Sequence, residues 1–408
     1  MAKVTSNTGR ALVIGGSMSG LLAGLLLRQH GWAVDVYERV ESELAGRGAG
    51  IVAQPELIER LRRLGLDTAG LGVEITTRKM FEASGRLIGT CECPQVLTAW
   101  ERVYRMLRAA FPPALYHRGK GLARFEQTDR LVKVQFADGT TTEGDLLVGA
   151  DGIRSTVRQQ CLSDLAPLYV GYVAWRALIA EAALPPAIHE ELFNYMSFCL
   201  PPGEQFLGYP VTGAEDGLRL GHRRYNIVWY RPAEEKSKLQ WLLTDERSVT
   251  HPISIPPPLI RREAIAEMRA DAERLIAPQL LAVARLIDAP ILQPIYDLAT
   301  PRMAFGRVAI IGDAAFVARP HVAAGVAKAA DDAAALVAAL VAEQDVMAAL
   351  KRFEAERLPS GRRIIEHARH LGAYLQATQT TEERARSQRH STAQAVLTET
   401  AVLDFLRA

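Results

Sequence analysis

The sequence has few cysteines, no long apolar run and no excess of charge of one sign. Its four cysteines include Cys91 and Cys93, a C-x-C pair with no second pair or histidine cluster to complete a zinc site. We therefore expect reduced, structural thiols and no metal. No stretch reaches about 18 apolar residues, which argues against a membrane span. Lys plus Arg number 48 and Asp plus Glu 46, which gives no reason to expect nucleic acid or an anionic membrane as a partner.

The polar segment Met1 to Arg10 lacks the apolar core of a signal peptide, so we expect a cytoplasmic protein. The 408 residues suit two or three domains. The apolar run Ala11 to Ile14 predicts a buried strand that ends in a Gly-rich segment. A helix from about Leu21 to His30 and a second strand, Ala33 to Tyr37, follow. This is a βαβ opening, which predicts a parallel sheet with a right-handed crossover.

The middle of the chain, from about Leu168 to Pro301, is richer in aromatic and β-branched residues, which favours mainly antiparallel strands. A helix is expected there from about Leu259 to Ile276. After Pro301 the first pattern returns, and from about Leu350 the chain is charged and helical. The remaining predicted strands are Val132 to Phe136 (followed by an Asp138-Gly139 hairpin turn), Asp145 to Val148, Tyr172 to Arg176, Gln205 to Pro210, Tyr225 to Tyr230 and Val308 to Ile311, and the remaining helix is Ala323 to Glu343.

The first strand ends in Gly15-Gly16-Ser17-Met18-Ser19-Gly20, and such a turn at a helix start presents free N–H groups to a pyrophosphate. Ser17 replaces the middle glycine of the G-x-G-x-x-G pattern. Glu38 lies 18 residues beyond Gly20, where a carboxylate accepts hydrogen bonds from ribose hydroxyls and repels a 2′-phosphate. FAD or NAD is therefore favoured over NADP. The alternative is a turn that needs glycine only for packing.

Two later segments also follow buried strands. In the first, Asp151-Gly152 precedes Ser155, which suits a helix cap, and Arg158, one turn further on. In the second, Gly312-Asp313-Ala314-Ala315 places a carboxylate at a strand end, and the helix beginning near Ala323 directs its positive end to the same region. Either segment alone is equally consistent with an ordinary strand–turn–helix.

In this order, the three motifs resemble the class A FAD-dependent aromatic hydroxylases, which share the p-hydroxybenzoate hydroxylase fold. The resemblance covers about Leu12 to Leu340. Most members have an arginine where Trp100 stands, with Arg102 and Arg105 nearby, and many have a histidine where Phe316 stands. The segments that resemble the 2,6-dihydroxypyridine 3-monooxygenase branch are Gly15 to Leu21 including Ser17, Gly50 to Leu57, Tyr172 to Arg176, Trp229-Tyr230 and Arg319 to Lys328.

The resemblance implies an α/β fold in three parts: a Rossmann-type FAD-binding domain (residues 1–72, 100–168 and 302–349), an inserted, mainly antiparallel β-sheet substrate domain (73–99 and 169–301) and a C-terminal helical segment (350–408). It implies an FAD-dependent monooxygenase that hydroxylates a small phenolic or hydroxypyridine ring through a flavin C4a-hydroperoxide. NADH or NADPH would be the transient reductant and O2 the co-substrate.

The resemblance also implies site residues. His321 is expected to touch substrate or flavin, or else to be a loop histidine bonded to backbone, and Tyr209 to orient a ring hydroxyl, or else to be a core tyrosine. We interpret Arg176 as an interdomain ion-pair residue, and Trp175 and Trp229 as packing residues. FAD contacts are expected at Gly15, Ser17, Met18, Ser19, Glu38, Arg39, Val52, Gln54, Asp151, Asp313, Ala323, Gly325 and Val326.

Alternatives stay open for the reaction. A related flavoprotein with other oxidation chemistry, an epoxidase or a reductase, would share these motifs, as would a flavin-binding partner module without turnover. The partner is expected to be a small aromatic or N-heterocyclic substrate. The exact ring, the hydroxylated position, the catalytic base and the oligomeric state, for which a homodimer is one alternative, stay open.

Overall fold

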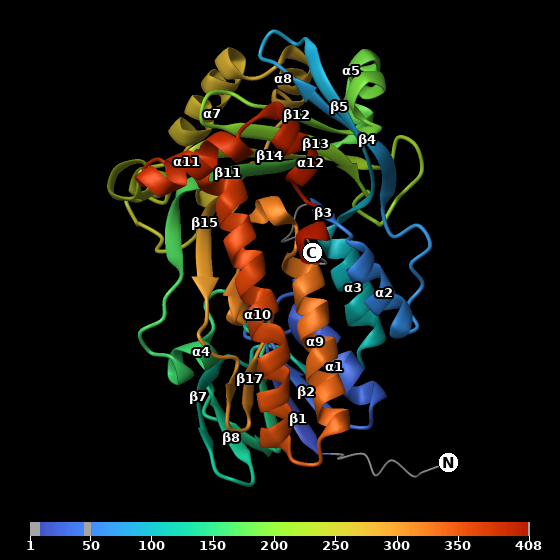
Figure 1. Ribbon diagram of the computed structural model, residues 1–408, viewed down its shortest axis with the longest axis vertical. Helices are drawn as coiled ribbons and strands as arrows, with labels where there is room; N and C mark the ends of the chain where they lie inside the picture. Colours follow the sequence, from blue (N-terminus) through green and yellow to red (C-terminus); the bar gives the residue numbers. More distant parts are fainter. Residues whose placement is uncertain (1–8, 45–49, 407–408) are drawn as a thin grey trace.

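The computed structural model describes residues 9–44 and 50–406. Most of the Met1 to Arg10 segment, on which the signal-peptide prediction depends, lies outside the described residues. Within the described ranges, no helix is long and apolar enough to cross a membrane. Two main sheets, one above the other in Figure 1, organise the chain.

The smaller main sheet has six strands in the order β16-β17-β10-β1-β2-β6. Its four central strands are parallel, which confirms the predicted βαβ opening. Helix α1 (Met18–Gln29) begins three residues before its predicted start, because the Gly-rich turn ends at Ser17, its N-cap. The strands are β1 (Arg10–Ile14), β2 (Ala33–Tyr37), β6 (Tyr116–His117), β10 (Leu146–Gly149), β16 (Ala304–Phe305) and β17 (Val308–Ile310).

The larger sheet has nine strands in the order β18-β15-β11-β14-β13-β12-β4-β5-β3. The three strands predicted in the middle of the chain lie within β11, β13 and β14, which pair antiparallel as expected. Its strands are β3 (Gly50–Val52), β4 (Val73–Phe81), β5 (Leu87–Ala99), β11 (Leu168–Ala180), β12 (Tyr195–Cys199), β13 (Gln205–Val211), β14 (Arg224–Pro232), β15 (Ile291–Ala299) and β18 (Phe316–Val317).

The two faces of the larger sheet bury different side chains, because successive residues of a strand point to opposite faces. Trp175 and Trp229 are register partners and pack in a cluster with the helices α7 (Arg262–Leu275) and α8 (Pro278–Ala284), which confirms them as packing residues. Tyr172, Tyr209 and Tyr230 share a separate cluster. That second cluster also contains Val52 of β3, the edge strand of the same sheet.

Two long helices pack side by side along the molecule, α9 (Gly325–Ala342) and α10 (Val346–Gly372) (Figure 1). Helix α9 begins two residues later than predicted. The reason is local: Pro320–Val322 form a 3-10 turn and Ala323 adopts φ +49°, which no helical residue has. The charged segment after Leu350 is helical, as predicted.

The remaining elements are a third sheet of three strands, in the order β7-β8-β9, and further helices. The Asp138-Gly139 turn joins β8 to β9 antiparallel, as predicted, and the helix predicted at 259–276 is α7. These elements are α2 (Pro55–Arg63), α3 (Trp100–Ala110), β7 (Leu122–Gln127), β8 (Val132–Phe136), β9 (Thr141–Gly144), α4 (Thr156–Cys161), α5 (Pro186–Leu192), α6 (Gln240–Leu242), α7 (Arg262–Leu275), α8 (Pro278–Ala284), α11 (Thr381–His390) and α12 (Ala393–Glu399).

Candidate functional site

A cavity of about 1140 Å³ lies between the two sheets. Its wall on the six-stranded sheet comes from the turn after β1, the end of β2, the turn after β10 and the turn after β17. Its wall on the larger sheet comes from Arg176, from residues 291–294 and Tyr296 of β15, and from the loop 251–257. The three motifs recognised in the sequence thus meet at one cavity. Of the predicted site residues, it is lined by Gly15, Ser17, Glu38, Arg39, Asp151 and Asp313.

The Gly-rich turn is shaped by close backbone contact. Gly15 has φ +108°, and a Cβ on it would lie 2.3 Å from the carbonyl oxygen of Ala150, so only glycine fits. A Cβ on Gly20 would lie 1.8 Å from the carbonyl of Gly15. Ser17 is the N-cap of α1, but its side chain makes no cap hydrogen bond. The Ser17 hydroxyl and the helix N-terminus therefore suit an anionic group in the cavity.

Glu38 is fixed at the end of β2. It is buried, and its carboxylate accepts hydrogen bonds from the backbone N–H of Gly16 (2.9 Å) and of Val40 (3.0 Å). Each carboxylate oxygen has a second lone pair for a ligand hydroxyl. Arg39 follows it on the cavity wall. Glu38 thus stands on the cavity wall at the end of β2, and its ribose-binding role stays a prediction.

The motif that begins at Asp151 is hydrogen-bonded to the motif that contains Asp313. Both oxygens of Asp151 accept hydrogen bonds at the start of α4, from the Ser155 hydroxyl and from the backbone N–H of Thr156 (2.7 Å) and Val157. Ser155 in turn caps Arg158 N, as predicted. The buried Arg158 guanidinium donates to the carbonyl of Ala314 (3.0 Å) and to that of Ile153. D-G-x-x-S-x-x-R therefore ties the turn after β10 to the turn after β17.

Asp313 occupies that second turn and its side chain is 55% exposed, facing the cavity. Although the carboxylate atoms face the cavity, the protein around the turn reduces their solvation, which raises the pKa of the Asp313 carboxyl, while Lys328 lowers it. Gly312 precedes it with φ +60°, and its N–H donates to Asp332 (3.0 Å). A carboxylate held open to the cavity in this way is suited to accept hydrogen bonds from ligand hydroxyls.

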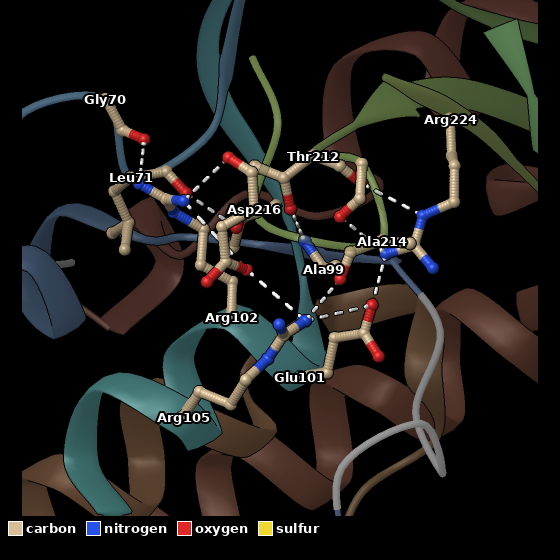
Figure 2. Close-up of polar contacts among 12 residues, drawn as sticks. Gly70, Leu71, Ala99, Glu101, Arg102, Arg105, Thr212, Ala214, Asp216 and Arg224 are labelled. Carbon is tan, nitrogen blue, oxygen red and sulfur yellow. Dashed lines mark hydrogen bonds and ion pairs between the residues drawn. The ribbon is translucent and has the colours of Figure 1, made fainter. Parts of the chain in front are cut away.

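The position of the family's usual arginine is taken by Trp100, which lines the cavity and stacks on Tyr104 at 5.2 Å. Figure 2 shows that Arg102 and Arg105, its neighbours on α3, lie in a separate network. Arg102 donates to the carbonyls of Asp216 and Gly70, and Arg105 donates to that of Ala214. These two arginines hold the loop after β13 and do not line the cavity.

Tyr209 and His321 belong to a buried aromatic cluster on the face of the larger sheet. The Tyr209 hydroxyl donates to the carbonyl of Gly50 (3.0 Å). His321 Nε2 lies 2.9 Å from the Tyr172 hydroxyl, and its ring packs 4.3 Å from that of Tyr230. Burial, with a smaller contribution from Arg319, lowers the pKa of His321 to about 3, so its imidazole is neutral at ordinary pH.

Val52, in the edge strand β3 of the larger sheet, and Gln54, which follows that strand, lie beside the same cluster. Val52 packs in it, and Gln54 Nε2 donates to the carbonyl of Ala401 (3.1 Å). The backbone N–H of Ala401 donates to the carbonyl of His321 (2.7 Å). A strap after α12 therefore links Gln54 to His321.

Arg176 joins the cavity to the aromatic cluster. It lines the cavity and donates to Gln293 (3.0 Å) and to the carbonyl of Gly50 (3.1 Å), beside Tyr209. The interpretation of Arg176 as an ion-pair residue was wrong, because both described partners are neutral oxygens. Tyr172 and Tyr230, which were not among the predicted site residues, contact His321; they lie on different strands, so no local sequence pattern brings them together.

The remaining predicted residues lie outside the cavity lining. Met18 is buried on the first turn of α1, and Ser19 lies against Gly312, whose Cβ would come within 2.2 Å of the Ser19 hydroxyl. Ala323 packs against the aromatic cluster. Gly325 and Val326 begin α9. The set thus divides between the cavity wall, the aromatic cluster and the two helix starts beside them.

Comparison with known proteins agrees with this geometry. The profile of a family described as FAD binding domain matches residues 9–167 and 261–368, and a second, FAD binding domain-like, matches residues 169–297. The second match fills the gap between the two parts of the first and overlaps the later part over residues 261–297.

Several characterised enzymes are similar along most of their length. The 2,6-dihydroxypyridine 3-monooxygenase of Paenarthrobacter nicotinovorans is 32% identical over 378 residues, 91% of this chain and 93% of that enzyme. The 3-amino-4-hydroxybenzoate 2-monooxygenase of Streptomyces cremeus is 30% identical, over 89% of this chain and 86% of that enzyme. The solved structure of 2,6-dihydroxypyridine-3-hydroxylase from Arthrobacter nicotinovorans superposes with a TM-score of 0.86 at 31% identity, covering 92% of this chain and 95% of that one.

Proposed function

Since this chain belongs to the FAD binding domain family of FAD-dependent monooxygenases, which hydroxylate aromatic and heterocyclic substrates, we propose that its own substrate is a small hydroxypyridine or phenol. The observation that carries the proposal is the cavity itself. It brings three FAD motifs to one wall and reaches, through Arg176, the tyrosine-rich face of the larger sheet. The 2,6-dihydroxypyridine 3-monooxygenase similarity, over 91% of the chain, favours hydroxypyridines over hydroxybenzoates.

The residues on the cavity wall fit FAD. We assign the ribose hydroxyls to Glu38, the pyrophosphate to Ser17 and the start of α1, and the ribityl hydroxyls to Asp313. In place of the absent family arginine, the cavity offers Arg39, Lys120 and Arg154 as cations. When bound, FAD supplies electron transfer from a nicotinamide and the activation of O2.

The aromatic cluster lies next to the side of the cavity, at Arg176, that we assign to the substrate ring. Tyr209, Tyr172 and Tyr230 are buried in this cluster and do not line the cavity; burial raises the pKa of each phenol, so they back the substrate side of the cavity as neutral aromatic groups. The neutral His321 acts as a hydrogen-bonding partner of Tyr172 and not as a cationic acid. The buried cluster thus gives this side of the cavity an apolar backing.

The balanced reaction is the conversion of a ring C–H to C–OH with one O2, one NAD(P)H and one proton, releasing NAD(P)⁺ and one water. A substrate hydroxyl in the ring makes it electron-rich, and an acceptor beside that hydroxyl increases this effect.

The test is a screen of hydroxypyridines and hydroxybenzoates against the FAD-loaded protein with NADH and with NADPH. The proposal expects one or more hydroxypyridines to accelerate NAD(P)H oxidation and to gain 16 mass units as product, the mass of one oxygen atom. Slow NAD(P)H oxidation that no ring compound accelerates would instead support a flavin-binding module without turnover.

A further inference from the structure

Lys328 has an unfavourable position. It lies in the first turn of α9 with its side chain 0% exposed, and its ammonium has no hydrogen-bond partner among the described residues. Burial of an ammonium is costly, and the positive end of a helix disfavours a cation. Two nearby carboxylates partly compensate the charge of the ammonium: Nζ lies 3.9 Å from Asp313 Oδ1 and 4.0 Å from Asp332 Oδ2.

The two carboxylates are not equivalent. Asp332 is buried and already bonded to Arg357 Nε (2.8 Å) and to the backbone N–H of Gly312 (3.0 Å). Asp313 faces the cavity, and Lys328 is the single cation within 4.0 Å of its carboxylate in the part of the chain that the structure describes. Lys328 therefore acts chiefly on Asp313, from the protein side of the turn.

We propose that Lys328 is a positioning residue for the cofactor, which keeps the Asp313 carboxylate ionised and oriented so that it accepts hydrogen bonds from the ribityl hydroxyls of FAD. This inference rests on the placement of Asp313 at FAD in the proposed function. A buried cation in this position also offsets the negative charge that Glu38, Asp151 and Asp313 bring to a cavity that receives a pyrophosphate.

The effect on ionisation has a definite sign. Burial raises the pKa of Asp313, Lys328 lowers it and Asp332 raises it. Loss of Lys328 moves the pKa of Asp313 up, so the ionised acceptor is lost at a higher pH as the solution is acidified. The affinity for FAD then falls as the pH falls.

Other charged groups on the elements packed around this turn have their own partners. Arg158 of α4 is bonded to the Ala314 carbonyl and Arg357 of α10 to Asp332. On α9 itself, Asp331 is paired with Arg60 of α2. None of these cations takes the place of Lys328 beside Asp313.

The test measures FAD dissociation constants by titration of apoprotein from alkaline pH down to the lowest pH at which every variant stays folded. Lys328→Met is expected to lose more affinity than the wild type as the pH is lowered, because its Asp313 carboxyl is protonated at a higher pH. Lys328→Arg, which keeps the charge, is expected to follow the wild-type pH profile. Lys328→Gln replaces the Met variant if the latter does not fold.

An Asp313→Asn background separates this role from a merely structural one. There the carboxyl no longer titrates, so Lys328→Met is expected to add no pH dependence. A loss of affinity in Lys328→Met that is equal at every pH, or that persists unchanged in the Asp313→Asn background, overturns the proposal. No ring substrate enters this assay, so its failure is distinct from failure of the proposed reaction. An Asp313→Asn protein with wild-type FAD affinity would overturn the placement of Asp313 itself.

Discussion

Replacement of Arg158 by methionine tests how the second and third motifs depend on each other. The methionine keeps an apolar stem of similar length but removes the donors to the carbonyls of Ala314 and Ile153. Arg158 is 0% exposed, so water cannot replace those donors. Hydrogen bonds from a charged donor contribute about 1.5–3 kcal/mol each, and an acceptor left buried without a partner costs about 1–3 kcal/mol.

We expect a loss of about 3–5 kcal/mol in the free energy of unfolding of the domain that carries the six-stranded sheet, because two such bonds are lost together. A loss of 1 kcal/mol shifts Tm by about 2–4 °C in a domain of about 150–250 residues, so Tm of the apoprotein is expected to fall by at least about 6 °C. FAD affinity is expected to weaken as well, because the Ala314 carbonyl anchors the turn that carries Asp313.

The assay is thermal unfolding of the apoprotein, followed by FAD titration at a temperature where the variant is folded. For the thermal measurement alone, the matched control is Arg154→Met on the same turn, since Arg154 is exposed and its described side-chain bond is to Ser254. A Tm of Arg158→Met within about 1 °C of the wild type would refute the reasoning, because it would mean that the two carbonyls are not left unpaired.

Three further predictions follow from the site. Asp313→Ala is expected to weaken FAD retention, measured as flavin content after gel filtration, because ligand hydroxyls lose an acceptor; wild-type content would count against the assignment. Glu38→Gln is expected to weaken FAD binding as well, since an amide accepts through one oxygen where the carboxylate accepts from Gly16 and Val40 through two, and an unchanged dissociation constant would contradict it. His321→Ala is expected to leave FAD bound but to release more peroxide per NAD(P)H oxidised. The pKa of His321 is lowered from 6.5 to about 3, so between these pH values the unfolded chain binds a proton that the folded chain does not. His321 therefore destabilises the fold as the pH falls from about 6.5 to about 3, and His321→Ala is expected to remove this effect. Acid unfolding curves that coincide for the wild type and the variant would contradict this.

The local part of the FAD site could be predicted from the sequence. Strand–turn–helix signals around Gly15, Asp151 and Gly312 are short-range, and their order along the chain pointed to one fold. The Arg158 bond to Ala314 could not be predicted, because it joins residues 156 positions apart.

The start of α9 shows a different limit. Ala323 has a positive φ that its residue type does not favour, so a pattern of Ala-rich helical residues placed the helix two residues too early. The hydrogen bonds of Ala401 with Gln54 and His321 were missed for the same reason as the Arg158 bond to Ala314, because they join residues that are distant in the sequence and meet only in the folded chain.

The central claim is that this chain transfers one oxygen atom from O2 to a hydroxylated ring. The direct measurement is turnover of 2,6-dihydroxypyridine by the FAD-loaded protein with NAD(P)H under ¹⁸O₂, with the product analysed by mass. The account predicts a product that carries one ¹⁸O atom, formed in step with NAD(P)H oxidation. A product whose new oxygen comes from water, or NAD(P)H oxidation that yields peroxide and unchanged ring compounds across the whole substrate panel, would contradict it.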